Sequence, residues 1–305
     1  MEELTKENRE PDLLEAPLVR KVGLWREIRR SKMAVVGLII TSILVLVALF
    51  APLLAPSDPR KTDLEAITRP PSSEHPLGTD DMGRDIASRI IYGSRISLSV
   101  GIVAEAISLA IGLTIGALAG YYGGRLDNLL MRFTDIIFAF PTALFAIAVS
   151  AVFERRTIGT LFLILGLIGW AGVARIVRGT VLSVKEREFA EAARALGAGD
   201  ARIIIRHILP NSLAPVIVAS SIGVAGNILT EAWLSFLGLG LEASVPSWGI
   251  MIRDGQQFIT AKPWICFFPG LAIIITVLGF NLLGDGLRDI LDPRLRGRQS
   301  LGGRL

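Results

Sequence analysis

Residues 34–54, AVVGLIITSILVLVALFAPLL, form a run of 21 residues without a charged side chain. An α-helix needs about 20 apolar residues to cross the hydrocarbon core of a bilayer. The run is too long for the apolar region of a cleaved secretory signal, and it follows a long polar segment. We therefore interpret it as a retained first membrane anchor.

The composition extends this interpretation to the whole chain. The 305 residues are 51% hydrophobic, and the mean hydropathy of +0.54 is well above that of an ordinary soluble domain. Five further segments are long and apolar enough to cross a bilayer, at residues 96–122, 129–153, 158–177, 213–237 and 264–283. The predicted fold class is an all-α, polytopic membrane protein with six transmembrane helices.

Charge and cysteine content exclude several classes of function. The net charge is +4, but the basic residues do not gather in one aromatic-laced patch, so we expect no nucleic-acid partner. A single cysteine, Cys266, excludes an internal disulfide and a cysteine-based zinc cluster. Only two histidines, His75 and His207, are present, and we therefore expect no metal site.

The distribution of Lys and Arg predicts the orientation in the membrane. Basic residues precede the first span and follow the last one, which places the terminal segments 1–33 and 285–305 in the cytoplasm. With six spans, the basic connection 178–211 is cytoplasmic too. Only the short turn with Arg155 and Arg156 favours the opposite orientation, and two charges do not outweigh the rest.

The cytoplasmic connection contains residues 188–211, EFAEAARALGAGDARIIIRHILPN. Its apolar side chains recur at helical spacing and form one stripe, made of Phe189, Ala192, Ala193 and Leu196. Gly197 is placed to end this helix, and Asp200 to cap a second helix that Pro210 ends. A stripe of small residues favours docking in a protein groove over lying flat on the membrane, although the membrane-surface alternative stays open.

The external connection, residues 55–95, begins with proline-rich sequence and ends with paired acids in HPLGTDDMGRDIASRIIYGSR. The stretch TDDMGRD suggests a calcium loop, but it lacks the glutamate that closes an EF-hand. We therefore expect no calcium there.

Several motifs resemble one family of transport proteins. The sequence EAA is followed after three residues by Gly, and later by Leu-Pro. This spacing resembles that of the cytoplasmic loop of permease subunits in binding-protein-dependent ABC importers. It is carried here by Glu191, Ala192, Ala193, Gly197, Leu209 and Pro210. The stretches HPLGTDDMGRDIASRIIYGSRISLSVG, GYYGGRLDNLLMRFTDIIFAFP, ILTEAWLSFLGLG and SWGIMI resemble the second, C-type permease of the dipeptide and oligopeptide branch. One departure is His207, where the family has isoleucine.

The resemblance implies a type I ABC importer permease fold, with residues 96–284 as the transmembrane core. It also implies the prokaryotic plasma or inner membrane as the location, and four kinds of partner besides the lipid bilayer. These are a homologous second permease subunit, two ABC ATPase subunits and an extracytoplasmic substrate-binding protein. Since the sequence has no GxxxxGK[ST] phosphate loop, we expect a non-catalytic chain without a cofactor, with ATP and magnesium bound by the ATPase subunits.

The expected substrates are dipeptides or oligopeptides, and the alternatives within the same importer class are nickel, an oligosaccharide or another small solute. An ion-coupled secondary transporter is a less favoured alternative, because such transporters usually have repeated halves and this sequence shows no internal repeat. A membrane enzyme would need a cluster of acids, histidines or a nucleophile that the sequence lacks.

The resemblance assigns two groups of residues to partner subunits. The group for ATPase coupling is Glu188, Phe189, Glu191, Ala192, Ala193, Leu196 and Gly197. The group for docking of the binding protein is Asp80, Asp81, Arg84 and Asp85. For the second group, an ordered loop that braces the spans is an equally weighted alternative.

Charged and polar residues inside the spans are further candidates, since burial in a membrane is costly. Asn227 and Glu231 lie one turn apart and are predicted to line the pathway or brace its outer gate, with a structural hydrogen-bond network as the alternative. Arg132 and Asp135 are predicted to pair with each other. Glycines at every fourth position, Gly112, Gly116 and Gly120, predict close helix packing. Pro141 and Pro269 each predict a kink.

Overall fold

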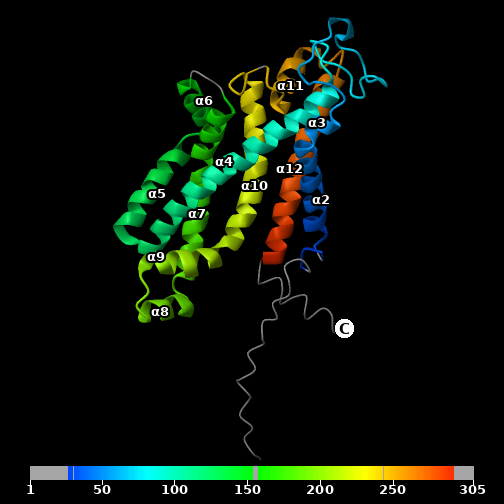
Figure 1. The fold of residues 1–305 in the computed structure, drawn as a ribbon. Helices are drawn as coiled ribbons and strands as arrows, with labels where there is room; N and C mark the ends of the chain where they lie inside the picture. The colour runs from blue at the N-terminus through cyan, green and yellow to red at the C-terminus, as the bar shows by residue number, and fades with distance from the viewer. Residues whose placement is uncertain (1–26, 30, 154–156, 243, 292–305) are drawn as a thin grey trace, which may run out of the picture.

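The computed structural model describes residues 27–29, 31–153, 157–242 and 244–291, which are almost entirely helical and contain no strand (Figure 1). Arg155 and Arg156, and most of the basic terminal segments, lie outside the described residues. The helices in chain order are α2 (Lys32–Leu49), α3 (Ala51–Leu54), α4 (Ile86–Tyr122), α5 (Gly124–Ala139), α6 (Thr142–Val152), α7 (Ile158–Val184), α8 (Glu188–Ala195), α9 (Asp200–Ile203), α10 (Leu209–Phe236), α11 (Trp248–Gly255) and α12 (Trp264–Leu291).

The number of membrane spans agrees with the prediction when one broken span is counted. Five helices are long and apolar enough to cross a bilayer, and the pair α5 and α6 makes a sixth span that is bent by 92°. The bend lies at Pro141, which lacks a backbone N–H and holds the preceding Phe140 in an extended conformation. The predicted kink at Pro141 is confirmed as a near right angle.

Helix α4 begins ten residues earlier than the predicted span. The side chain of Asp85 caps the helix by accepting a hydrogen bond from the backbone N–H of Ser88, at 2.7 Å. With 37 residues, α4 is about 55 Å long, which exceeds the thickness of the hydrocarbon core. The span predicted from residue 96 therefore covers only part of this helix, because hydropathy does not detect the polar turns by which a helix extends beyond the bilayer.

Helices α4 and α7 pack along the glycine stripe. A Cβ atom at Gly112 would lie 2.6 Å from Cβ of Val173, and one at Gly116 would lie 2.5 Å from the carbonyl oxygen of Ala174. Only glycine allows such a close approach of the two helices. The predicted packing role of the stripe within the subunit is confirmed.

The first anchor, α2, lies along α12 at one side of the molecule (Figure 1). This contact also depends on glycine, since a Cβ atom at Gly37 would lie 2.3 Å from the backbone nitrogen of Leu283. Most of the α2 surface stays exposed and apolar, as expected for a helix in lipid. Residues 55–85 cover one end of the helices, and α8 lies at the opposite end (Figure 1).

Candidate functional site

The helix α8 ends as the sequence predicts. Gly197 follows the C-cap with φ of +78°, a left-handed conformation that glycine adopts without strain. The N–H of Gly197 donates to the carbonyl of Arg194 at 2.9 Å, and the N–H of Ala198 donates to the carbonyl of Ala193 at 3.0 Å. These two bonds are those of a Schellman motif, which closes the helix sharply.

The apolar stripe of α8 is divided between two surfaces. Ala193 is buried against the chain itself, and Phe189 packs partly against the same cluster, which includes Val181 of α7. Leu196 is 88% exposed, and Ala192 is exposed too. The inward face is centred on Ala190 and Ala193, three residues apart, so the four predicted residues do not form a single docking face.

The outward surface of α8 is therefore different from the predicted stripe. It consists of exposed acidic and small side chains with one large apolar residue, and its members are Glu188, Glu191, Ala192, Ala195 and Leu196. Ala193 belongs to the inner core of the permease itself, which is a correction to its predicted role on the docking face. The sequence could not distinguish the two faces, because alanine occupies both.

The second helix of the connection does not end at Pro210. A π-helical turn, Ile204–Ile208, joins α9 directly to α10, and Pro210 lies in the first turn of α10. Proline lacks a backbone N–H and interrupts the regular hydrogen-bond pattern of a helix, and here the π-helical turn directly precedes it. Asp200 also differs from its predicted capping role, since its side chain accepts a hydrogen bond from the hydroxyl of Tyr121 at 2.8 Å.

The two predicted pathway residues lie in hydrogen-bond networks between α4 and α10. Glu231 is fully buried, and it accepts hydrogen bonds from the hydroxyls of Ser235 at 2.8 Å and Ser97 at 3.4 Å. Asn227 donates through Nδ2 to Glu105 at 3.1 Å. This arrangement favours the alternative prediction for Glu231, a structural hydrogen-bond network, since its carboxyl group faces the interior of its own chain.

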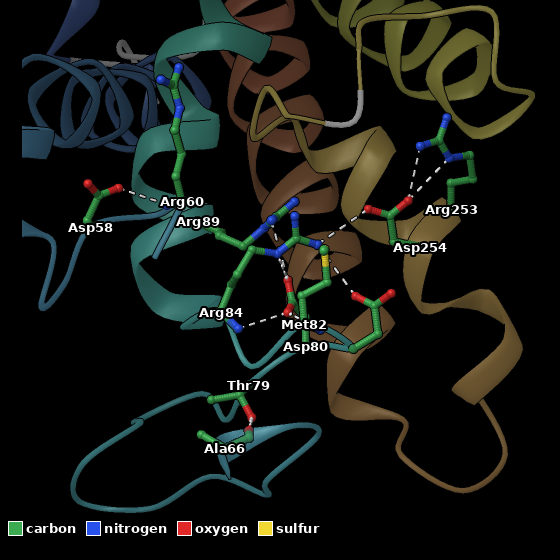
Figure 2. Close-up of polar contacts among 11 residues, drawn as sticks. Asp58, Arg60, Ala66, Thr79, Asp80, Met82, Arg84, Arg89, Arg253 and Asp254 are labelled. Carbon is green, nitrogen blue, oxygen red and sulfur yellow. Dashed lines mark hydrogen bonds and ion pairs between the residues drawn. The ribbon is translucent and has the colours of Figure 1, made fainter. Parts of the chain in front are cut away.

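At the N-terminal end of α4, Asp80 organises a buried cluster of charges (Figure 2). Its Oδ1 atom accepts from the backbone N–H groups of Met82 and Arg84, both at 2.9 Å. Its Oδ2 atom accepts from Nε of Arg84 at 2.7 Å and lies 3.4 Å from Nη1 of Arg89. Arg84 also approaches Asp254 of α11, at 3.7 Å, so the cluster joins the loop to two helices.

The predicted docking residues of this loop are mostly inaccessible to a partner. Asp80, Arg84 and Asp85 are buried, and Asp85 binds Nδ1 of His75 at 3.1 Å besides capping α4. Asp81 is partly exposed, and burial raises the pKa of its carboxyl group, with a further increase from Asp80 and an opposing effect of Arg84. The contacts favour the bracing role for Asp80, Arg84 and Asp85.

Two ion pairs hold α5 against α7 in place of the predicted pair within α5. Asp127 binds Arg178 through two contacts, at 2.5 and 2.6 Å, and Asp135 binds Arg175 at 2.7 Å. The guanidinium group of Arg175 also lies 3.9 Å from the ring centroid of Phe138. The predicted pairing of Asp135 with Arg132 is wrong, because α7 brings a closer cation that is 40 residues away in sequence.

Metal-ligating side chains do not gather in the described part of the chain. No group of three or more His, Cys, Asp or Glu residues there could hold a metal ion. The carboxylate of Asp80 is occupied by Arg84 and by the backbone N–H groups of Met82 and Arg84.

Comparisons with known proteins give consistent results over most of the chain. Residues 112–297 match the family described as binding-protein-dependent transport system inner membrane component, and residues 23–71 match the N-terminal TM domain of oligopeptide transport permease C. The chain is 47% identical to the dipeptide transport system permease protein DppC of Alkalihalophilus pseudofirmus, over 90% of this chain and 91% of that protein. It is 42% identical to the oligopeptide transport system permease protein OppC of Bacillus subtilis, over 91% and 92% of the two chains.

A third relative carries the name of another transport system. The glutathione transport system permease protein GsiD of Pectobacterium atrosepticum is 42% identical, over 89% of this chain and 90% of that protein.

A solved structure shows the same fold. A chain of the inward-facing MetNI methionine ABC transporter matches with a TM-score of 0.55 and 18% identity, over 67% of this chain and 96% of that chain. The predicted type I ABC importer permease fold is therefore confirmed. With two family matches and relatives that cover about nine-tenths of its length, the chain belongs to the family of binding-protein-dependent transport system inner membrane components.

Proposed function

We propose that this chain forms half of the translocation pathway in an ATP-driven, binding-protein-dependent importer of dipeptides or oligopeptides. The peptide substrate is supported by relatives named for dipeptide and oligopeptide transport. The relative named for glutathione transport supports another small solute as the alternative within the same importer class. The relatives named above do not point to nickel, an oligosaccharide or an ion-coupled mechanism.

The proposed transporter contains this chain, a homologous second permease subunit, two ABC ATPase subunits and an extracytoplasmic substrate-binding protein. ATP and magnesium are bound by the ATPase subunits, since this sequence has no phosphate loop of its own. The complex lies in the plasma or inner membrane of a prokaryote. Both termini and α8 are on the cytoplasmic side, and residues 55–85 are outside.

The observation that carries the coupling role is the position of α8. Its outward surface is exposed, while Ala193 attaches the helix to a cluster that includes Val181 of α7 and Ile203 of α9. Ala190, on the same inward face, is fully buried. An ATPase subunit that moves α8 therefore moves the inner ends of α7 and of the continuous α9 to α10 helix with it. A nucleotide-dependent preference for one position of α8 then shifts the permease between two packings.

The acidic residues of α8 suit a contact with a basic rim of the ATPase subunit. Glu188 and Glu191 lie in the first turn, where the helix dipole favours negative charge, and both are exposed. Leu196, at the other end of the helix, provides the one large apolar contact on the same surface. We assign Gly197 the role of fixing where the helix ends.

Reconstitution of the complete transporter tests this proposal. The four kinds of subunit are assembled in proteoliposomes, and uptake of a labelled dipeptide is measured with ATP and with a nonhydrolysable analogue. We expect accumulation only with ATP and only with the binding protein present. Uptake that follows a proton or sodium gradient without ATP would refute the proposal.

A further inference from the structure

Helix α5 carries a row of polar side chains that the coupling and bracing roles leave unexplained. Arg125, Asn128, Arg132 and Asp135 recur at intervals of three and four residues, so they share one face of the helix, and all four are exposed. The neighbouring face is apolar and also exposed, at Leu129, Phe133 and Ile136. A third face, with Asp127 and Thr134, is buried against the rest of the chain.

This polar face lies at the depth of the bilayer, in the half nearer to α8. Asp135 pairs with Arg175 of α7, and Arg175 precedes the end of α7 by nine residues, which is about 13 Å of helix. Charged side chains at such depth are costly in lipid and usually face water or protein. The apolar face, with Leu129, Phe133 and Ile136, can face lipid or a second permease subunit without this cost.

The charges on the polar face are only partly neutralised by the chain itself. Asp135 and Arg175 form a pair whose side chains are both about half exposed. In the part of the chain that the structure describes, no acidic side chain pairs with Arg132 or Arg125. An exposed guanidinium group without an acidic partner is well suited to bind a carboxylate through two parallel N–H groups.

We propose that the polar face of α5 lines the half of the translocation pathway nearer to α8, and that Arg132 and Asp135 there receive the oppositely charged ends of a zwitterionic solute. The two residues are three apart on one helix, which places their Cβ atoms about 5–6 Å from each other. An extended dipeptide spans about 7 Å between its charged ends. The inference deepens the proposed importer function and depends on it.

A thiol-accessibility experiment in the complete reconstituted transporter tests this inference. In a Cys266→Ala background, Asn128→Cys is compared with Leu129→Cys, its neighbour on the apolar face. Membrane-impermeant thiosulfonates of either charge are added from the side of α8, and labelling of this subunit is followed by mass spectrometry. We expect Asn128→Cys to react at least about tenfold faster, and the anionic reagent to be favoured because Arg132 lies one turn away.

The role of the charge is tested by adding a second substitution to Asn128→Cys. Arg132→Gln should lower the anionic-to-cationic rate ratio about tenfold, whereas Arg132→Lys should keep it. Labelling of Asn128→Cys as slow as that of Leu129→Cys would overturn the inference, since protein or lipid would then cover the polar face. A ratio that Arg132→Gln leaves unchanged would overturn it too. ATP-driven uptake by the same proteoliposomes shows separately whether the importer function itself holds.

Discussion

The two ends of the molecule both carry charged segments with glycines, but the charges are buried at one end and exposed at the other. At the end that residues 55–85 cover, Asp80 is buried and bound to the buried arginines Arg84 and Arg89. At the α8 end, Glu188 and Glu191 are exposed and form no ion pair within the described part of the chain. A buried network consolidates the fold, whereas exposed charges on a lightly attached helix remain available to a partner.

The comparison changes how the two motifs are interpreted. From sequence, the acids near Asp80 and those of α8 are both predicted contact residues, with a bracing loop as the equally weighted alternative for the first group. Burial separates them, because a partner subunit cannot reach a carboxylate that already accepts four hydrogen bonds or ion-pair contacts from its own chain. The contacts therefore favour a bracing role for the loop of residues 55–85, and α8 is the better candidate for a moving contact.

The largest effect is expected where the buried network loses its central charge. Asp80→Asn leaves the guanidinium groups of Arg84 and Arg89 buried without their carboxylate, which should cost about 3–5 kcal/mol of stability. The measurement is thermal unfolding of the purified subunit complex in detergent. Glu74→Gln is the matched control, since Glu74 is an exposed acid of the same loop and should change stability by less than about 0.5 kcal/mol. Equal unfolding temperatures for the two variants would contradict the bracing role.

Two neighbouring alanines of α8 should respond differently to a larger side chain: one substitution should lower stability, and the other should weaken the contact with the ATPase subunits. Ala193→Leu overpacks the core beneath α8 and should destabilise the protein by about 1–3 kcal/mol. Ala192→Leu points outward and should leave stability within about 0.5 kcal/mol, yet weaken co-purification with the ATPase subunits. Thermal unfolding and pull-down yields of both variants check this prediction. If Ala192→Leu lowered stability and Ala193→Leu weakened co-purification instead, Ala193 would face the ATPase subunit.

A smaller effect is expected at the glycines that follow α8. A serine at Gly197 must adopt a φ of +78°, which costs about 1–2 kcal/mol. The same replacement at Gly199 meets a φ of −69° at the start of α9, where serine is a favoured capping residue. No atoms lie within 4 Å of a Cβ at either position, so the backbone conformation alone distinguishes them. ATP-driven uptake should fall for Gly197→Ser and persist for Gly199→Ser, and equal uptake would show that the position of the helix end is unimportant.

Features that depend on local spacing could be predicted from the sequence. The end of α8 at Gly197, the glycine stripe of α4 and the break at Pro141 each follow from residues within one or two turns. Glycine and proline restrict the backbone wherever they occur, so their effect needs no knowledge of distant contacts.

Features that depend on distant partners could not be predicted. Asp135 pairs with Arg175 of another helix, and Ala193 is buried because α7 and α9 pass beside it, which no periodicity within α8 reveals. The sequence identified the acids of the loop 55–85 as candidates for docking or bracing. The choice between these roles depended on whether Arg84 and Arg89 would reach Asp80. The start of α4 at residue 86 was missed because its first turns are polar.

The smallest effect is expected for Glu231, a fully buried acid between the two ends that forms no ion pair within the described residues. The hydroxyls of Ser97 and Ser235 donate to different oxygens of Glu231. Glutamine preserves the shape of the side chain; its oxygen can accept from one hydroxyl, and its NH2 group can donate to the oxygen of the other. Glu231→Gln should therefore change stability by less than about 1 kcal/mol and leave ATP-driven uptake intact. Glu231→Leu removes the acceptor from two buried hydroxyls and should cost about 1–3 kcal/mol. If Glu231→Gln folds normally but transports nothing, the negative charge itself is required, and Glu231 belongs to the pathway after all.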